Sequence, residues 1–164
     1  MARLTSDELA NAIPDLLSSQ SLSGLRESVE THRDAWGIPH IKATNEWDLF
    51  FAQGFITAQD RLWHMDADRY RALGRWSEFV GESGLAQDKL LRAAGMGRSS
   101  KLDYEVASDE AKAMIDAYTA GVNAFIESDQ PLPVEYGILG LTPEKWENWH
   151  CIINYKMRNS LLGT

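Results

Sequence analysis

The 164-residue sequence has a single cysteine, Cys151, and no long apolar run. One cysteine excludes a disulfide within the chain, and we expect Cys151 to be a buried, unreactive thiol. No stretch approaches the ~20 apolar residues that cross a membrane. Blocks of like charge are also lacking, and the net charge of −8 argues against nucleic acid as a partner, because phosphate binding needs clustered Lys and Arg.

Several motifs of catalysis are absent as well. The sequence contains no P-loop, no dinucleotide-binding glycine pattern and no H-E-x-x-H zinc motif. The stretch Gly81–Gly84 is one residue short of a G-x-S-x-G nucleophile elbow, so we interpret it as a plain turn. Composition and spacing therefore identify no catalytic constellation in this chain.

The first 27 residues differ in character from the rest. They predict a short helix over 5–17, followed by the polar, linker-like stretch 18–24. Pro14 interrupts the apolar part of this helix, which argues against a signal peptide. The protein is cytoplasmic if Met1 is native and periplasmic if a signal peptide was replaced, and the sequence leaves both open.

Residues 28–164 predict one α+β, mostly helical domain. Residues that favour strands flank a turn at 34–37, which predicts a two-stranded hairpin. Apolar residues at helical spacing predict the helices, with Gly54 at a close helix contact and Ser108 as an N-cap. The expected elements are strands over 28–32 and 39–43, and helices over 46–80, 88–94 (ended by Gly95 or Gly97), 109–127 and 147–161.

One cluster of polar residues suggests a metal site and has a simpler interpretation. His64, Asp66 and Asp68 lie close in the sequence. Residues 64 and 66 point about 200° apart on a helix, so they cannot share an ion. We interpret Asp66 with Arg69, and Asp68 with Arg71, as a solvated ion-pair face. The sequence therefore predicts no metal site here.

Two further polar positions have structural interpretations. His40 follows a proline in a predicted strand, and we interpret it as a structural histidine, with a catalytic role left as the alternative. Asp60 and Arg61 lie within an apolar helical stretch. A buried pair must be hydrogen-bonded to offset its desolvation, so we expect these two residues to lock two elements together.

A series of short motifs occupies residues 33–66. It reads RD, GIPHI, DLFF, AQDRLW and MD, in that order, and it continues with RALGR, AY, GVNA and LTP. The series resembles the start of the penicillin acylase family of N-terminal-nucleophile hydrolases. The resemblance extends from about Ser28 to the end of the chain, whereas the first 27 residues match no pattern.

The resemblance implies that this chain is the α subunit of a self-processed precursor. Such an enzyme hydrolyses N-acyl amides to a carboxylic acid and an amine. Its nucleophile is a serine at the start of a β chain, activated by its own α-amine, so we expect no catalytic residue here. The implied partners are that β subunit and a small-molecule N-acyl amide. The implied fold is the four-layer αββα sandwich, which the β subunit completes.

The resemblance assigns substrate binding to the last helix. Family members have a methionine there that lines the acyl pocket, and a residue four positions later that gates it. Aligned without gaps, these become Met157 and Leu161. Ser160 replaces an arginine and Leu161 an aromatic residue of phenylacetyl-preferring members. A preference for an aliphatic acyl group is therefore as compatible with the sequence as a preference for phenylacetyl. Core filling is the alternative for Met157.

The resemblance implies no cofactor or metal from this chain. Family members often bind a structural calcium through an α-chain glutamate just beyond the last helix, and this sequence ends at Thr164, before that position. Calcium is therefore left to the partner chain. Whether Thr164 directly precedes the serine or a linker is removed stays open. The alternative from another class is a non-catalytic helical binding protein that acts alone.

Overall fold

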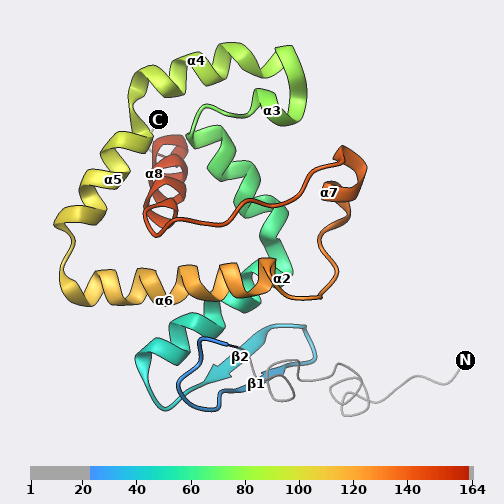
Figure 1. The fold of residues 1–164 in the computed structure, drawn as a ribbon, viewed down its shortest axis with the longest axis vertical. Helices are drawn as coiled ribbons and strands as arrows, with labels where there is room; N and C mark the ends of the chain where they lie inside the picture. The colour runs from blue at the N-terminus through green and yellow to red at the C-terminus, as the bar shows by residue number, and fades with distance from the viewer. Residues whose placement is uncertain (1–22, 163–164) are drawn as a thin grey trace, which may run out of the picture.

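The computed structural model describes residues 23–162, with side chains through residue 159. The described chain is largely helical with one two-stranded sheet, as predicted (Figure 1). The predicted helix over 5–17 lies outside the described residues. The elements are β1 (Glu30–Arg33), β2 (Pro39–Lys42), α2 (Glu46–Ala72), α3 (Ser77–Val80), the 3-10 turn η1 (Gly81–Gly84), α4 (Leu85–Ala94), α5 (Met96–Val106), α6 (Asp109–Ile126), α7 (Val134–Leu139) and α8 (His150–Leu162).

The predicted hairpin is confirmed. β1 and β2 pair antiparallel, with Thr31 opposite Ile41. The Asp34 carboxylate accepts hydrogen bonds from the N–H groups of Trp36 and Ile38, each 2.9 Å long. This side chain-to-backbone bonding stabilises the tight turn, which is completed by a glycine at φ +77° at position 37.

Asp48 fixes the beginning of α2. The Asn45 side chain caps the helix by accepting from the Asp48 N–H at 2.9 Å. The buried Asp48 carboxylate in turn accepts from the N–H groups of Arg26 at 2.8 Å and Glu27 at 2.9 Å. The chain ahead of the hairpin is thereby tied to the first turn of the helix.

The long helical region predicted over 46–80 is interrupted and forms two helices. α2 ends at Ala72 because Gly74 adopts φ +64°, which reverses the chain. The next segment starts a separate short helix, α3, where Asp88 accepts from the N–H groups of Trp76 and Ser77, each at 2.8 Å. α2 is also irregular at Arg61, which has φ −144° and ψ 19°.

The remaining helices follow the predictions in part. α4 begins at Leu85, ahead of the expected 88, and ends at Gly95 with φ +70°, as predicted. α5 and α7 were not predicted. α8 starts at His150, later than the expected 147. Gly81–Gly84 forms the predicted turn, in which the Ser83 hydroxyl donates to the Val80 carbonyl.

Two glycines set the crossing of α2 and α6, which Figure 1 shows near the middle of the molecule. A Cβ atom on Gly54 would lie 2.0 Å from the Tyr118 carbonyl oxygen, and one on Gly121 would lie 1.9 Å from the Phe51 carbonyl oxygen. The predicted close contact at Gly54 is therefore confirmed. Ser108 caps α6 as predicted, since its side chain accepts from the Ala111 N–H at 3.2 Å.

The core consists of two apolar clusters, one at the α2–α6 crossing and one at the other end of α2. The first contains Val29, Ala52, Phe55, Ile56, Ala58, Leu62, Met65, Val122, Phe125, Tyr136 and Trp146. The second contains Ala72, Trp149, Ile153 and Met157. α8 contributes to the second cluster and packs against both α2 and α5. Among residues 23–162, no helix combines the length and apolar character needed to cross a membrane.

Candidate functional site

The last helix, α8, carries the three residues predicted to bind substrate. Met157 is 5% exposed and packs in the second core cluster with Trp149 and Ile153. The α8 backbone continues through Ser160 and Leu161, whose side chains lie outside the described part of the chain. Residues four apart lie on one helix face, so Met157 and Leu161 share a face. Their role toward substrate stays a prediction.

The start of α8 is bonded through the His150 ring. Nδ1 accepts the Glu147 N–H at 2.9 Å and lies 3.3 Å from Arg69 Nη1. Arginine is always a donor, so Nδ1 is the unprotonated nitrogen of a neutral imidazole. Burial and the Arg69 charge lower the pKa of His150 to about 4, which keeps the ring neutral near neutral pH.

Arg69 of α2 connects His150 to a buried carboxylate. Its guanidinium lies 2.9 Å from Asp66 and also donates to the backbone oxygens of Lys145 at 3.2 Å and Glu144 at 3.3 Å. The side chains of Asp66 and Arg69 are each 1% exposed. Our prediction of a solvated ion-pair face was therefore wrong for this pair, because residues 66 and 69 share the inward face of α2 with Leu62 and Met65.

Two aromatic side chains complete the bonding of Asp66. The Tyr136 hydroxyl donates to it at 2.6 Å and the Trp146 indole N–H donates at 2.8 Å. Burial raises the pKa of the Asp66 carboxyl, while Arg69 and these two donors oppose the rise. We call these five residues the buried polar network: Asp66, Arg69, Tyr136, Trp146 and His150.

The buried polar network joins α2 to α7 and to the region where α8 begins, both of which are far from α2 in the sequence. It lies between the two core clusters, since Tyr136 and Trp146 belong to the first and the His150 ring packs 4.3 Å from Trp149 of the second. Sequence reasoning missed its long-range members. Only the spacing of Asp66 and Arg69 gave a local signal, and the other partners carry none.

The other acidic residue of the His64, Asp66 and Asp68 group also forms ion pairs. Asp68 binds Arg158 of α8 at 2.7 Å and approaches Arg71 at 3.9 Å, so the predicted pairing with Arg71 is confirmed. His64 contacts the same Arg158 guanidinium. Across residues 23–162, no group of three or more His, Cys, Asp or Glu side chains could hold a metal ion.

The predicted pair of Asp60 and Arg61 differs from expectation. Both residues are exposed, so the prediction of a buried pair was wrong. Asp60 instead accepts from Arg33 of β1 at 2.7 Å and joins the hairpin to α2. The helical pattern could not show this, because the irregular backbone at Arg61 turns the helix surface there.

His40 and Cys151 have structural partners. The His40 ring stacks on His32, with centroids 4.7 Å apart, and its Nε2 lies 3.2 Å from Asp34. The Cys151 thiol lies 3.4 Å from the Thr119 hydroxyl, and burial raises its pKa to about 11. A thiol with so high a pKa is poorly reactive. Cys151 is half-buried rather than buried as expected. The contacts of both residues otherwise agree with the structural roles expected for them.

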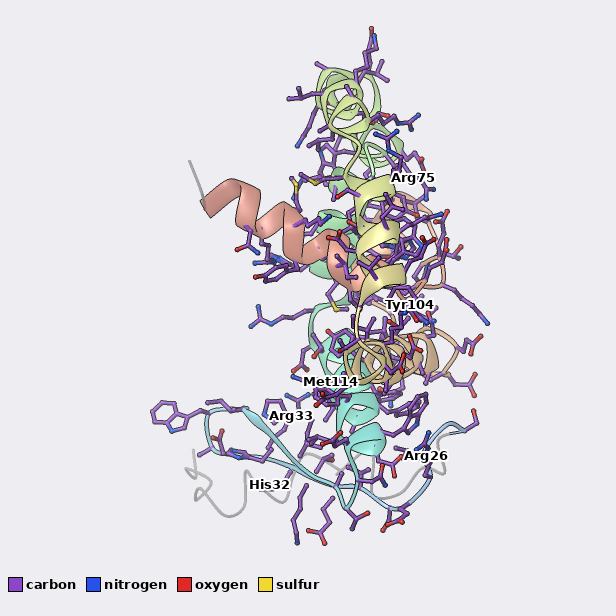
Figure 2. All side chains as sticks on the ribbon, turned by 90° about the vertical axis from the view of Figure 1, so that its left-hand side faces the viewer. Arg26, His32, Arg33, Arg75, Tyr104 and Met114 are labelled. Carbon is purple, nitrogen blue, oxygen red and sulfur yellow. The ribbon has the colours of Figure 1, made fainter. Side chains whose placement is uncertain are left out.

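An apolar groove of about 330 Å³ opens between α2, α6 and α8. Met114, which Figure 2 labels, is 37% exposed and lies on its α6 side. Its lining consists of Phe50, Gln53, Met65, Met114, Ile115, Tyr118, Trp146, Cys151 and Asn154. The outer part of the α6 apolar stripe therefore faces this groove, while Val122 and Phe125 fill the core.

Known proteins resemble this chain in sequence and in fold. It is 46% identical over 163 residues to the penicillin acylase 2 proenzyme of Pseudomonas sp. (strain SE83), covering 99% of this chain and 21% of the relative. It is 34% identical over 138 residues to the acyl-homoserine lactone acylase QuiP of Pseudomonas putida, covering 84% of this chain and 17% of that relative. The chain thus spans about a fifth of the length of the curated relatives it matches.

A solved structure shares the fold of this chain. A thermostable penicillin G acylase from Alcaligenes faecalis superposes with a TM-score of 0.75 at 26% sequence identity, covering 85% of this chain and 77% of that one. A penicillin amidase family model matches residues 28–164, the range over which the sequence resembles that family. The chain belongs to the penicillin amidase family.

Proposed function

We propose that this chain is the α-subunit part of a self-processed amidohydrolase that cleaves N-acyl amides to a carboxylic acid and an amine. The observation that carries the proposal is the 46% identity, along nearly the whole chain, to a proenzyme of which it spans about a fifth. The relatives are named as acylases of penicillin and of acyl-homoserine lactones. They favour an enzyme over a helical binding protein that acts alone.

In this proposal the chemistry belongs to a β chain from the same precursor. A serine freed at its N-terminus attacks the amide, and the α-amine of that serine takes the hydroxyl proton. Oxyanion donors on the β chain stabilise the tetrahedral intermediate. The bonding of His40 to Asp34 and the raised pKa of Cys151 support structural rather than chemical roles for those two side chains.

The α chain would contribute to the acyl pocket through α8. Met157 and Leu161 share a helix face, and Ser160 precedes the second of them. We propose that these residues form one wall of the pocket for the acyl group of the substrate once the β chain covers α8. The four-layer αββα sandwich would be completed by that chain, and any structural calcium would be held by it.

The full-length precursor tests this function. Maturation should release a second chain that begins with serine, and the product should hydrolyse at least one of a panel of penicillins, acyl-homoserine lactones and acyl anilides. A full-length protein that stays uncleaved and hydrolyses none of them would contradict the proposal. Mass spectrometry of the purified protein and amine release measure the two outcomes.

Two substitutions test the acyl pocket. Leu161→Phe should narrow the pocket and Met157→Ala should relax it, changing the ratio of kcat/KM values for long and short acyl groups by roughly 10-fold or more. Tyr155→Ala is the matched control, because Tyr155 lies on the same helix and is 70% exposed in this chain. If each variant changes kcat/KM by the same factor for every substrate, Met157 and Leu161 only fill the core.

A further inference from the structure

The N-terminus of α8 is capped by a histidine side chain, a residue that is not usual in this role. In a capping box, a Glu or Gln side chain bonds back to the N–H group three residues earlier. Here the His150 ring does so, since its Nδ1 accepts the Glu147 N–H at 2.9 Å. A histidine places this acceptor on a rigid ring rather than on a flexible stem.

The same nitrogen faces Arg69 of α2, so one atom bonds the start of α8 and also the helix beneath it. Both terminal nitrogens of Arg69 are held, because Nη1 also donates to the Lys145 oxygen while Nη2 contacts Asp66 and the Glu144 oxygen. The guanidinium is planar and presents its donors in a fixed fork. The three side chains that make these contacts, those of Asp66, Arg69 and His150, are all buried.

Because a helix is rigid, the position of His150 also determines the position of the C-terminal end of α8. Met157 follows His150 by about two turns, and Leu161 follows by about three, so all three residues lie on one face. Figure 2 shows α8 projecting at its C-terminal end from the body of the chain, on the side to which the hairpin also extends. A shift at His150 therefore displaces the whole projecting segment.

Two ion pairs also hold α8 along its length. Arg158 binds Asp68 of α2 at 2.7 Å, and Lys156 binds Asp103 of α5 at 2.6 Å. Arg158 is 56% exposed and Asp103 is 52% exposed, so solvent weakens both pairs. The buried contact at His150 is thus the more rigid attachment.

We propose that His150 is a positioning residue for acyl selectivity. By accepting from both Glu147 and Arg69, it sets the register of α8 on α2 and thereby the placement of Met157 and Leu161. This inference rests on the proposed function of those two residues, and it assigns no contact between His150 and the substrate.

The test uses the full-length, matured enzyme and a short-chain and a long-chain acyl amide that compete in one reaction. The ratio of their kcat/KM values does not depend on how much enzyme folds, so a loss of stability alone leaves it unchanged. His150→Phe keeps a ring and removes the acceptor, and it should shift the ratio about tenfold. His150→Asn keeps an acceptor near the position of Nδ1, and it should restore the ratio to within about twofold of the wild type.

Two more variants keep the test decisive. His150→Gln retains an acceptor but places it further from the backbone, so it should shift the ratio in a protein that still matures. Glu144→Gln is the matched control, because Glu144 lies in the same loop as Glu147 and the substitution removes only its exposed ion pair with Arg75. Its ratio should equal that of the wild type.

The outcomes separate this inference from the proposed function. Equal ratios in the wild type, His150→Phe and His150→Gln, with all rates lowered together, would overturn the positioning role and leave the enzyme assignment intact. A wild-type protein that hydrolyses no acyl amide would instead contradict the proposed function. A shifted ratio in the Phe and Gln variants with rescue by Asn would support the inference.

Discussion

Asp66 and Arg69 form an ion pair from which water is excluded. Removing one member of such a pair leaves a buried charge without compensation. Asp66→Asn should therefore lower the free energy of unfolding by about 3–5 kcal/mol. Urea unfolding of the full-length protein measures the change.

The Glu30–Lys42 pair provides the control for that substitution. Its side chains are 77% and 80% exposed, respectively. Lys42→Gln should change the free energy of unfolding by less than about 1 kcal/mol, as is usual for exposed pairs. Equal losses in the Asp66→Asn and Lys42→Gln proteins would contradict the assignment of a dominant buried pair.

His150 should make stability depend on pH. Its pKa falls from 6.5 to about 4 on folding, so the unfolded chain takes up a proton at a higher pH than the folded chain does. The contribution to stability is complete above pH 6.5 and is lost as the pH falls toward 4, by about 3 kcal/mol in all. Urea unfolding of the full-length protein at a series of pH values measures the loss.

His150→Asn isolates this effect, because asparagine does not titrate. The raised pKa of Asp66 acts in the opposite direction, since the folded state takes up that proton first as the pH falls. Both proteins contain Asp66, so the difference between their stability curves reports His150. A difference that stays constant from pH 7 to pH 4 would contradict the buried, neutral histidine.

The sequence predicted single residues well where their partners are local. Ser108 as a cap and the turn residues at Asp34 and Gly37 depend on neighbours within a few positions. It failed for Asp66, because an i,i+3 ion pair gives the same pattern on either face of a helix. The bonds from Tyr136 and Trp146 come from distant parts of the chain and leave no periodic signal.

Among the helices, the contact between α2 and α6 tolerates the least change. Gly54→Ala would place a methyl group 2.0 Å from a backbone oxygen, where no side-chain rotation relieves the clash. We expect the free energy of unfolding to fall by about 3 kcal/mol or more, at the upper end of overpacking effects. The midpoint of thermal unfolding of the full-length protein checks this.

Gly137 is the matched control on α7. A Cβ atom at this position meets nothing within 4 Å, and the residue does not have positive φ. Gly137→Ala should leave stability unchanged or raise it by up to about 1 kcal/mol, because alanine favours a helix. If Gly54→Ala is tolerated as well as Gly137→Ala, the two helices do not cross as closely as described.

Helices with strong apolar periodicity were predicted with nearly correct bounds, as α6 shows. The long prediction over 46–80 failed at Gly74, because periodicity continues across a glycine that reverses the backbone. α5 and α7 are largely exposed. For such helices, tertiary contacts rather than local pattern decide the structure.

The described residues expose several large apolar side chains to solvent. Large apolar side chains are exposed on several elements: Trp36, Ile38, Leu90, Val106, Val134, Ile138 and Tyr155 are each at least 55% exposed. Exposed apolar patches promote association. We expect residues 1–164 expressed alone to aggregate or to unfold without a cooperative transition. Sedimentation and calorimetry test this, and a monomer with a sharp transition would contradict it.

The hairpin has a consequence for spectroscopy. All six tryptophans lie in the described part of the chain, and Trp36 at the hairpin turn, 88% exposed, is the only one of them that is exposed. Its indole should emit at long wavelength and be quenched by iodide more strongly than the other five rings, which are buried or half-buried. Iodide quenching of intrinsic fluorescence therefore reports whether anything covers the turn, and Trp36→Phe identifies its share of the signal.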